Sequence, residues 1–205
     1  AQNTLFLYFR MLVVMAVSFY TTREILRLLG VVDYGIYNVV GGIVAMFSFV
    51  NSTLTTSSQR YFSIELAKGD LKRLNQWFCL NITTFSIFIG IFILISETIG
   101  LWFVNTQMTI PSERLFAANV VYQLSILTFC IHFISIPYNA LIVAHERMSA
   151  FAYISIVEAF LKLVIVFILS IITWDKLIIY AILMCMSSLT ITLSYVIYNR
   201  KHFCE

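Results

Sequence analysis

The feature that most constrains this chain is a series of long apolar runs, each about the length of a membrane-spanning helix. A helix needs roughly 20 apolar residues to cross the core of a bilayer. Because that core offers the backbone no hydrogen-bond partners, runs of this length predict α-helices that span a membrane. The six predicted spans cover residues 4–29, 36–59, 75–103, 115–144, 151–173 and 177–198.

The composition supports a membrane protein. Of the 205 residues, 60% are hydrophobic and 11% are charged, whereas a soluble domain has about 25% charged residues. The formal net charge of +3 is spread over the chain and forms no nucleic-acid-binding patch. A transmembrane barrel would need segments of about 10 residues that alternate apolar and polar side chains, and residues 85–95 do not alternate. The predicted fold class is therefore an all-α, polytopic membrane protein.

The aromatic and basic residues predict the orientation of the spans. Trp77, Trp102 and Trp174 lie at span ends, where tryptophan is enriched at membrane interfaces. Basic residues are more frequent after the second, fourth and sixth spans than after the first, third and fifth. Cytoplasmic loops carry an excess of lysine and arginine. Both ends of the segment are therefore expected in the cytoplasm. The cytoplasmic set is Arg60, Lys68, Lys72, Arg73, Arg147, Arg200 and Lys201, against Arg23, Arg27, Arg114 and Lys176 on the other side.

Several charged residues lie within or close to the predicted spans, where a charge is costly and so needs a partner or a function. Glu158 and Lys162 are four residues apart in the fifth span, a spacing that allows an ion pair. They are either a structural pair or part of a cavity that binds an anion or a coupling cation. Arg23 and Arg27 share one helix face and are either interfacial anchors or a patch suited to phosphate. Arg10 either extends to the membrane surface or takes part in the function together with Glu158, Lys162 and the Arg23 and Arg27 patch.

The second span carries a stripe of small and polar side chains at helical spacing. Such a stripe serves either close helix packing or a water-filled cavity. The density of hydroxyl and amide groups favours the cavity, and the candidate binding residues here are Asn38, Asn51, Ser52, Thr56 and Gln59.

The fourth span adds Tyr138 and Asn139 to the candidate binding residues, next to Pro137. His132 in the same span is more typical of a hydrogen-bonded packing residue. No catalytic or nucleotide-binding motif is present, and the four cysteines show no metal-binding spacing. The sequence therefore predicts no enzyme activity, no cofactor and no metal site.

Three segments resemble one family of membrane transporters. They are residues 23–38 (REILRLLGVVDYGIYN), residues 59–70, with QRYF and AKGD, and residues 137–148, with PYNA and AHERM. In this order and spacing the chain resembles the Wzx-type O-antigen and polysaccharide flippases of the multidrug/oligosaccharidyl-lipid/polysaccharide exporter superfamily.

The resemblance implies a fold of two six-helix lobes, of the MATE-like type, in the bacterial inner (plasma) membrane. Residues 1–205 would form the first lobe, so the second lobe is absent and the chain is expected to be a fragment or a truncated form. The implied activity is alternating-access transfer of a lipid-linked oligosaccharide, a polyprenyl diphosphate sugar, from the inner to the outer leaflet. Membrane lipid, a polysaccharide polymerase and other assembly proteins are the implied partners.

With this substrate, Arg23, Arg27 and Lys162 are expected to attract the diphosphate, and the amide and hydroxyl side chains to bind sugar hydroxyls. One alternative is a cation-coupled multidrug extruder of the same fold, with Glu158 as its ion site. A second alternative is a non-transporting membrane scaffold. The lack of catalytic motifs argues against a membrane-bound enzyme.

Overall fold

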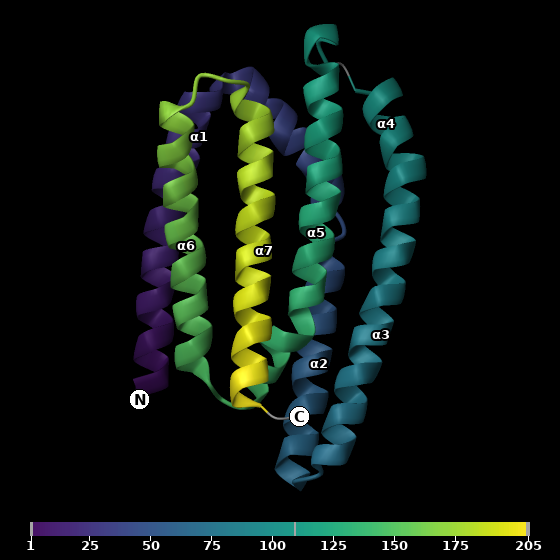
Figure 1. Ribbon diagram of the computed structural model, residues 1–205, viewed down its shortest axis with the longest axis vertical. Coiled ribbons are helices and arrows are strands. Elements are labelled where there is room, and N and C mark those ends of the chain that lie inside the picture. The colour runs from purple at the N-terminus through teal and green to yellow at the C-terminus, as the bar shows by residue number, and fades with distance from the viewer. Residues whose placement is uncertain (1, 109, 204–205) are drawn as a thin grey trace.

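The computed structural model describes residues 2–108 and 110–203, and its regular secondary structure in this part is entirely helical. The long helices lie side by side along one common direction (Figure 1). A π-helical segment, η1 (Ser96–Gly100), joins α3 to α4, and a 3-10 turn, η2 (Ser112–Arg114), precedes α5. The helices are α1 (Gln2–Ala45), α2 (Ser48–Lys68), α3 (Leu71–Ile95), α4 (Leu101–Thr106), α5 (Leu115–Ala144), α6 (Met148–Ile171) and α7 (Lys176–His202).

Five helical stretches are long and apolar enough to cross a membrane. This supports the predicted all-α, multi-pass membrane protein. The predicted second span is not one of the five. Residues 36–59 divide between α1 and α2 at a turn formed by Met46 and Phe47, and α2 is long enough but too rich in polar and charged side chains. The five stretches are Tyr8–Ala45, Leu71–Thr106, Ser112–Ala144, Met148–Ile171 and Lys176–His202.

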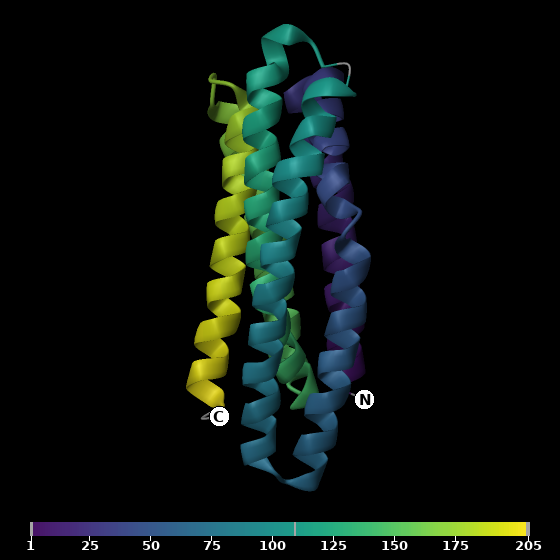
Figure 2. The ribbon, with the colours of Figure 1, turned by 90° about the vertical axis from the view of Figure 1, so that its right-hand side faces the viewer.

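Gly30 divides α1 into two arms, residues 2–29 and 31–45. Its backbone has φ 80° and ψ 169°, a region of conformational space that is essentially restricted to glycine. The second arm turns back toward the end at which the first arm begins (Figures 1 and 2). Gly30 therefore acts as a reversal point, and the arms on its two sides take up different positions in the bundle.

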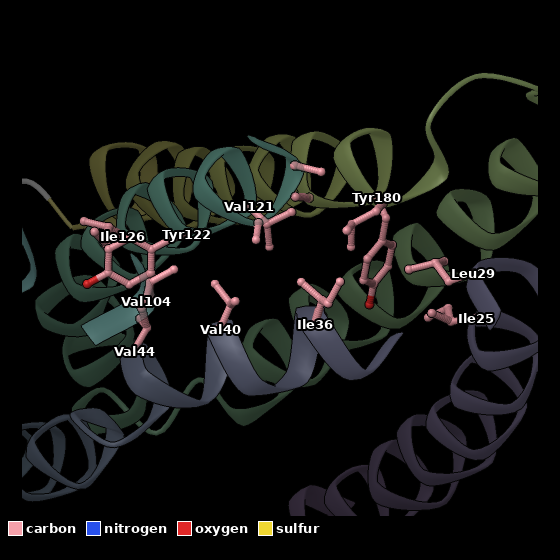
Figure 3. Packing of buried hydrophobic residues seen from close by; sticks show 14 of the residues in the cluster. Ile25, Leu29, Ile36, Val40, Val44, Val104, Val121, Tyr122, Ile126 and Tyr180 are labelled. Atoms are coloured by element: carbon pink, nitrogen blue, oxygen red, sulfur yellow. The ribbon is translucent and has the colours of Figure 1, made fainter. Parts of the chain in front are cut away.

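The main core lies where the second arm of α1 packs against α5. Ile36, Val40 and Val44 recur at four-residue spacing on one face of this arm and are buried. They point toward Val121 and other buried side chains of α5 (Figure 3). A regular apolar stripe thus fixes the arm against α5.

One cation joins three segments at the end of the bundle that contains Gly30. The guanidinium of Arg114 lies 3.1 Å from a carboxylate oxygen of Asp33 and 2.7 Å from one of Asp175. The other oxygen of Asp175 accepts a hydrogen bond from the backbone N–H of Leu177 and so caps α7. Arg114 therefore links the second arm of α1 to the first turns of α5 and α7.

The opposite end of the bundle contains both the start of α1 and the end of α7 (Figures 1 and 2). The hairpin of α2 and α3 also turns at this end. Gly69 ends α2 in the left-handed conformation, with φ 71°, and the carboxylate of Asp70 accepts a hydrogen bond from the N–H of Arg73 at the start of α3. Phe62 and Leu74 pack the hairpin against Ala140 and Leu141 of α5.

Replacing Gly30 with alanine is predicted to destabilise the protein by about 1–3 kcal/mol, because an L-residue is strained in this backbone conformation. A Cβ atom at this position meets no other atom within 4 Å, so the cost is conformational and not a clash. Gly35→Ala is the matched control, since Gly35 is helical and equally open. Thermal unfolding in detergent measures both variants; an equal Tm would contradict the assigned role of Gly30.

Replacing Arg114 with glutamine is predicted to lower the stability by about 1–2 kcal/mol, because Asp33 is nearly buried and loses its cation. The loss stays small because the Arg114 side chain is 38% exposed and water screens its charge. Lys176→Gln removes a cation at the same end that has no ion pair within the described residues. Thermal unfolding of the two variants should differ, with Arg114→Gln the less stable; equal melting temperatures would remove the linking role of Arg114.

Candidate functional site in two adjoining polar cavities

The larger cavity lies between the second arm of α1, helix α2, helix α5 and helix α7. Its volume is about 790 Å³, within the range of small-molecule binding sites. One wall is formed by the polar face of α2, and the facing wall by Ser125, Thr128 and His132 of α5. The α2 side of the cavity contains Ser48, Asn51, Ser52, Thr55, Thr56 and Gln59.

The hydroxyl groups of Ser52, Thr55 and Thr56 on the α2 wall already have partners within their own helix. Thr55 donates to the carbonyl of Asn51 at 2.7 Å, and Thr56 donates to the carbonyl of Ser52 at 2.9 Å. The side-chain oxygen of Asn51, by contrast, is buried and accepts no hydrogen bond within the described residues. An unsatisfied amide oxygen costs free energy, so Asn51 is the position on this wall most in need of a donor from water or a ligand.

The smaller cavity lies between the first arm of α1 and helices α5, α6 and α7, and its volume is about 300 Å³. One face of α6 supplies four of its side chains at spacings of four, three and four residues: Phe151, Ser155, Glu158 and Lys162. Because side chains three or four residues apart lie one above another on a helix, they form a column along the cavity wall.

An ion pair lies in this column. The ammonium of Lys162 is 2.9 Å from a carboxylate oxygen of Glu158, and the side chains are 33% and 43% exposed. The sequence predicted this pair from the four-residue spacing, and the structure contains it. Both groups line the cavity, so each keeps part of its surface for water or a ligand.

Arg10 is a second cation of the same cavity. Its guanidinium lies 4.3 Å from the centre of the Phe151 ring, a geometry in which the ring attracts a cation. The Nε of Arg10 is buried and has no hydrogen-bond partner within the described residues, and the same holds for the side-chain oxygen of Asn139. Arg10 and Asn139 thus bring an unused donor and an unused acceptor to the smaller cavity.

The two cavities adjoin, since Thr128, His132 and Met184 line both. The acidic and basic side chains that line the combined site are Arg10, Glu158 and Lys162, which gives a formal charge of +1. The arrangement therefore offers one net positive charge next to a wall of hydroxyl and amide groups. Such a site suits a ligand with an anionic part and a part rich in hydroxyl groups.

The predicted binding residues fall into two groups. Those that line a cavity are Asn51, Ser52, Thr56 and Gln59 in the larger one and Asn139, Glu158 and Lys162 in the smaller one.

The other predicted residues line neither cavity. Arg23 and Arg27 are exposed near the reversal at Gly30, and Arg27 lies 3.9 Å from Glu24. Asn38 is exposed and donates to the carbonyl of Tyr34. Tyr138 packs edge-on against Phe78. The structure therefore does not bring the Arg23 and Arg27 patch together with Lys162.

The sequence singled out Arg10 as a charge in need of a partner or a function but did not place it among the candidate binding residues, and it missed Thr128 and His132 of α5 as residues of the site. A signal for Arg10 was present, because an arginine within an apolar span needs a partner. The four-residue spacing of Thr128 and His132 was also visible. Within the described residues, no group of three histidine, cysteine or acidic side chains has metal-binding geometry.

Comparison with known proteins adds no relative: no family model, no curated protein and no solved structure matches this chain.

A cysteine placed at Ser52 is predicted to react with a water-soluble maleimide roughly tenfold faster than one placed at Phe167, because only a hydrated thiol ionises readily. Ser52 lines the larger cavity, whereas Phe167 is exposed on the apolar helix α6. The native cysteines are first replaced with serine, and labelling is followed in reconstituted membranes. Equal rates at the two positions would show that the cavity is not hydrated.

Proposed function

We propose that this chain forms part of a membrane transporter that moves a lipid-linked oligosaccharide, a polyprenyl diphosphate sugar, from the inner to the outer leaflet of a bacterial inner membrane. The observation that carries the proposal is the pair of adjoining polar cavities with a formal charge of +1 between helices of membrane-spanning length. The resemblance of residues 23–38, 59–70 and 137–148 to Wzx-type flippases supports the same activity.

The chemistry of the two cavities matches the two parts of the head group. A diphosphate needs cationic donors, and Arg10 and Lys162 are the cations of the smaller cavity. A sugar needs many hydrogen-bonding groups, and the larger cavity provides the α2 wall with Asn51 and Gln59. This assignment replaces the expected Arg23 and Arg27 contacts with Arg10.

The rest of the proposal follows the resemblance. A second lobe of the complete protein would face the cavity side of this chain, and rocking of the two lobes would expose the head group to either side of the membrane. Both ends of the segment would lie in the cytoplasm, as the basic residues predict, and a polysaccharide polymerase would take up the product. Fold resemblance alone does not fix a substrate, so the substrate assignment depends on the charges of the site.

The ion pair weakens the alternative of a cation-coupled multidrug extruder. A coupling cation would need the carboxylate of Glu158, but Lys162 already occupies it at 2.9 Å. A positively charged drug would also meet a site with a formal charge of +1.

Substitutions at the two members of the ion pair are predicted to affect substrate binding differently. In the complete protein, Lys162→Ala is expected to weaken binding of a polyprenyl diphosphate sugar roughly tenfold, the value of one charge-assisted hydrogen bond. Glu158→Gln removes the competing carboxylate and raises the formal charge of the site to +2, so binding is expected to stay equal or tighten. Binding is measured with purified protein in nanodiscs by titration with the lipid-linked sugar.

Lys176→Ala is the matched control, because Lys176 lies outside both cavities. In cells that depend on the complete protein, Lys162→Ala should also lower surface polysaccharide at unchanged protein level. Normal polysaccharide with Lys162→Ala would refute its role in transport. Loss of drug resistance with unchanged polysaccharide would favour the multidrug extruder.

A further inference from the structure

Four polar side chains form a seam between η1, α4 and α5, away from both cavities; the polar seam consists of Glu97, Asn105, Asn119 and Gln123. The amide of Gln123 donates to a carboxylate oxygen of Glu97 at 3.2 Å. The amide of Asn119 donates to the side-chain oxygen of Asn105 at 3.1 Å. The seam thus has two rungs, each joining the α3–α4 side to α5.

The polar seam faces outward from the bundle. Glu97, Asn105 and Gln123 are exposed, and Asn119 is partly exposed. None of the four lines either polar cavity. On α5, the seam and the cavity wall face different directions, because Gln123 and Thr128 are five residues apart, a rotation of about 140° at 3.6 residues per turn.

The Glu97–Gln123 rung lies within the membrane-spanning part of the chain, and the Asn105–Asn119 rung lies at its edge. Glu97 belongs to the stretch Leu71–Thr106, which is apolar enough to cross a membrane. Trp102 is predicted to mark the interface, and five residues at roughly 1.5 Å each place Glu97 about 7.5 Å deeper in the span. Isoleucine, leucine and phenylalanine side chains with high exposure surround it, as expected for a face in contact with lipid.

The local backbone holds Glu97 in place next to Gln123. The hydroxyl of Tyr122 donates to the carbonyl of Ser96 at 2.8 Å, which anchors the π-helical segment η1 to α5. Gly100 allows this close approach, because a Cβ atom at that position would clash with the Tyr122 hydroxyl. Since Tyr122 and Gln123 are adjacent, the same contact sets the position of the Glu97–Gln123 rung.

A carboxylate at this depth is costly without a compensating partner. Among the described residues Glu97 forms no ion pair, and the Gln123 amide is its hydrogen-bond partner. Polar side chains on exposed faces of membrane helices commonly bond to another helix. A protein surface that packs against the polar seam would therefore need hydrogen-bond donors at the depth of Glu97. It would also need amide groups at the depth of Asn105 and Asn119.

A second copy of this chain offers such a surface. A two-fold axis along the membrane normal keeps every residue at its own depth and exchanges the two sides of the seam. Glu97 of one copy would then face Gln123 of the other, and Asn105 would face Asn119. Each acceptor thereby meets a donor, so the seam is complementary to itself.

From this complementarity we infer that the polar seam is the contact surface of a two-fold symmetric homodimer in the membrane. The inference is independent of the transported substrate, because the seam and the cavities face different directions. In the dimer, both cavities stay clear of the contact between the copies.

The test measures the dimer fraction of the full chain in lipid bilayers by single-molecule photobleaching over a dilution series. The unsubstituted chain is expected to form dimers. Glu97→Leu combined with Gln123→Leu removes the first rung and should weaken dimerisation at least roughly fivefold, in keeping with about 1 kcal/mol or more for interhelical hydrogen bonds. Glu97→Gln keeps an acceptor and a donor at this position and should retain the dimer.

Thr98→Leu is the matched control, since Thr98 is exposed beside Glu97 but bonds to its own helix at the carbonyl of Leu94. A monomer at all dilutions would overturn the inference, and so would a dimer that Glu97→Leu with Gln123→Leu leaves unchanged. Thermal unfolding of the double variant checks that the chain stays folded without the Glu97–Gln123 hydrogen bond.

Discussion

The absence of water in a bilayer core is the constraint on which the rest of this structure depends. Each backbone N–H and C=O in the core must find its partner within the chain, and the long helices meet this demand. Side-chain hydroxyl groups follow the same rule: Thr55, Thr128 and Ser155 each donate to the carbonyl four residues earlier. The chain can thus place many polar groups in an apolar setting at little cost, and the groups that stay unsatisfied stand out.

The few departures from regular helix are the points that position these unsatisfied groups. The reversal at Gly30 brings the second arm of α1 against α5, and the turn at Met46 and Phe47 separates this arm from α2. Residues on both sides of that turn line the larger cavity. The π-helical segment η1 is fixed by the Tyr122 hydroxyl on the carbonyl of Ser96. The π-helical segment thus has a partner that compensates its backbone, and the turn at Met46 and Phe47 is followed by Asn51, whose side-chain oxygen is unsatisfied within the described residues.

The sequence predicted those features of the fold that are local. Apolar length and the polar turns between runs are read within a few residues, and the predicted span 115–144 has the bounds of α5. The turn at Met46 and Phe47 was not predicted, because neither residue is a helix breaker. The link from Arg114 to Asp33 and Asp175 was missed as well, since it joins segments far apart in the chain.

The candidate site shows the same division. The spacing of Glu158 and Lys162 predicted their ion pair, which one helix forms by itself. Helical spacing also predicted the polar face of α2. It does not show which helices pack together, and so it could not choose between Arg10 and the Arg23 and Arg27 patch as companions of Lys162. That choice depends on the packing of the first arm of α1 against α6, where the Arg10 guanidinium meets the Phe151 ring.

The charged side chains of the protein include two kinds: some bond across several segments, and others bond within their own helix. Arg114 bonds across three segments, so any competing anion must break contacts that hold the bundle together. Among the described residues Lys162 bonds only to Glu158 on its own helix, and exchanging this partner for the phosphate of a ligand breaks no contact between helices. A charge that is to bind and release a ligand in every transport cycle needs this second arrangement. The local pair keeps Lys162 compensated in the empty cavity and leaves it available to an incoming anion.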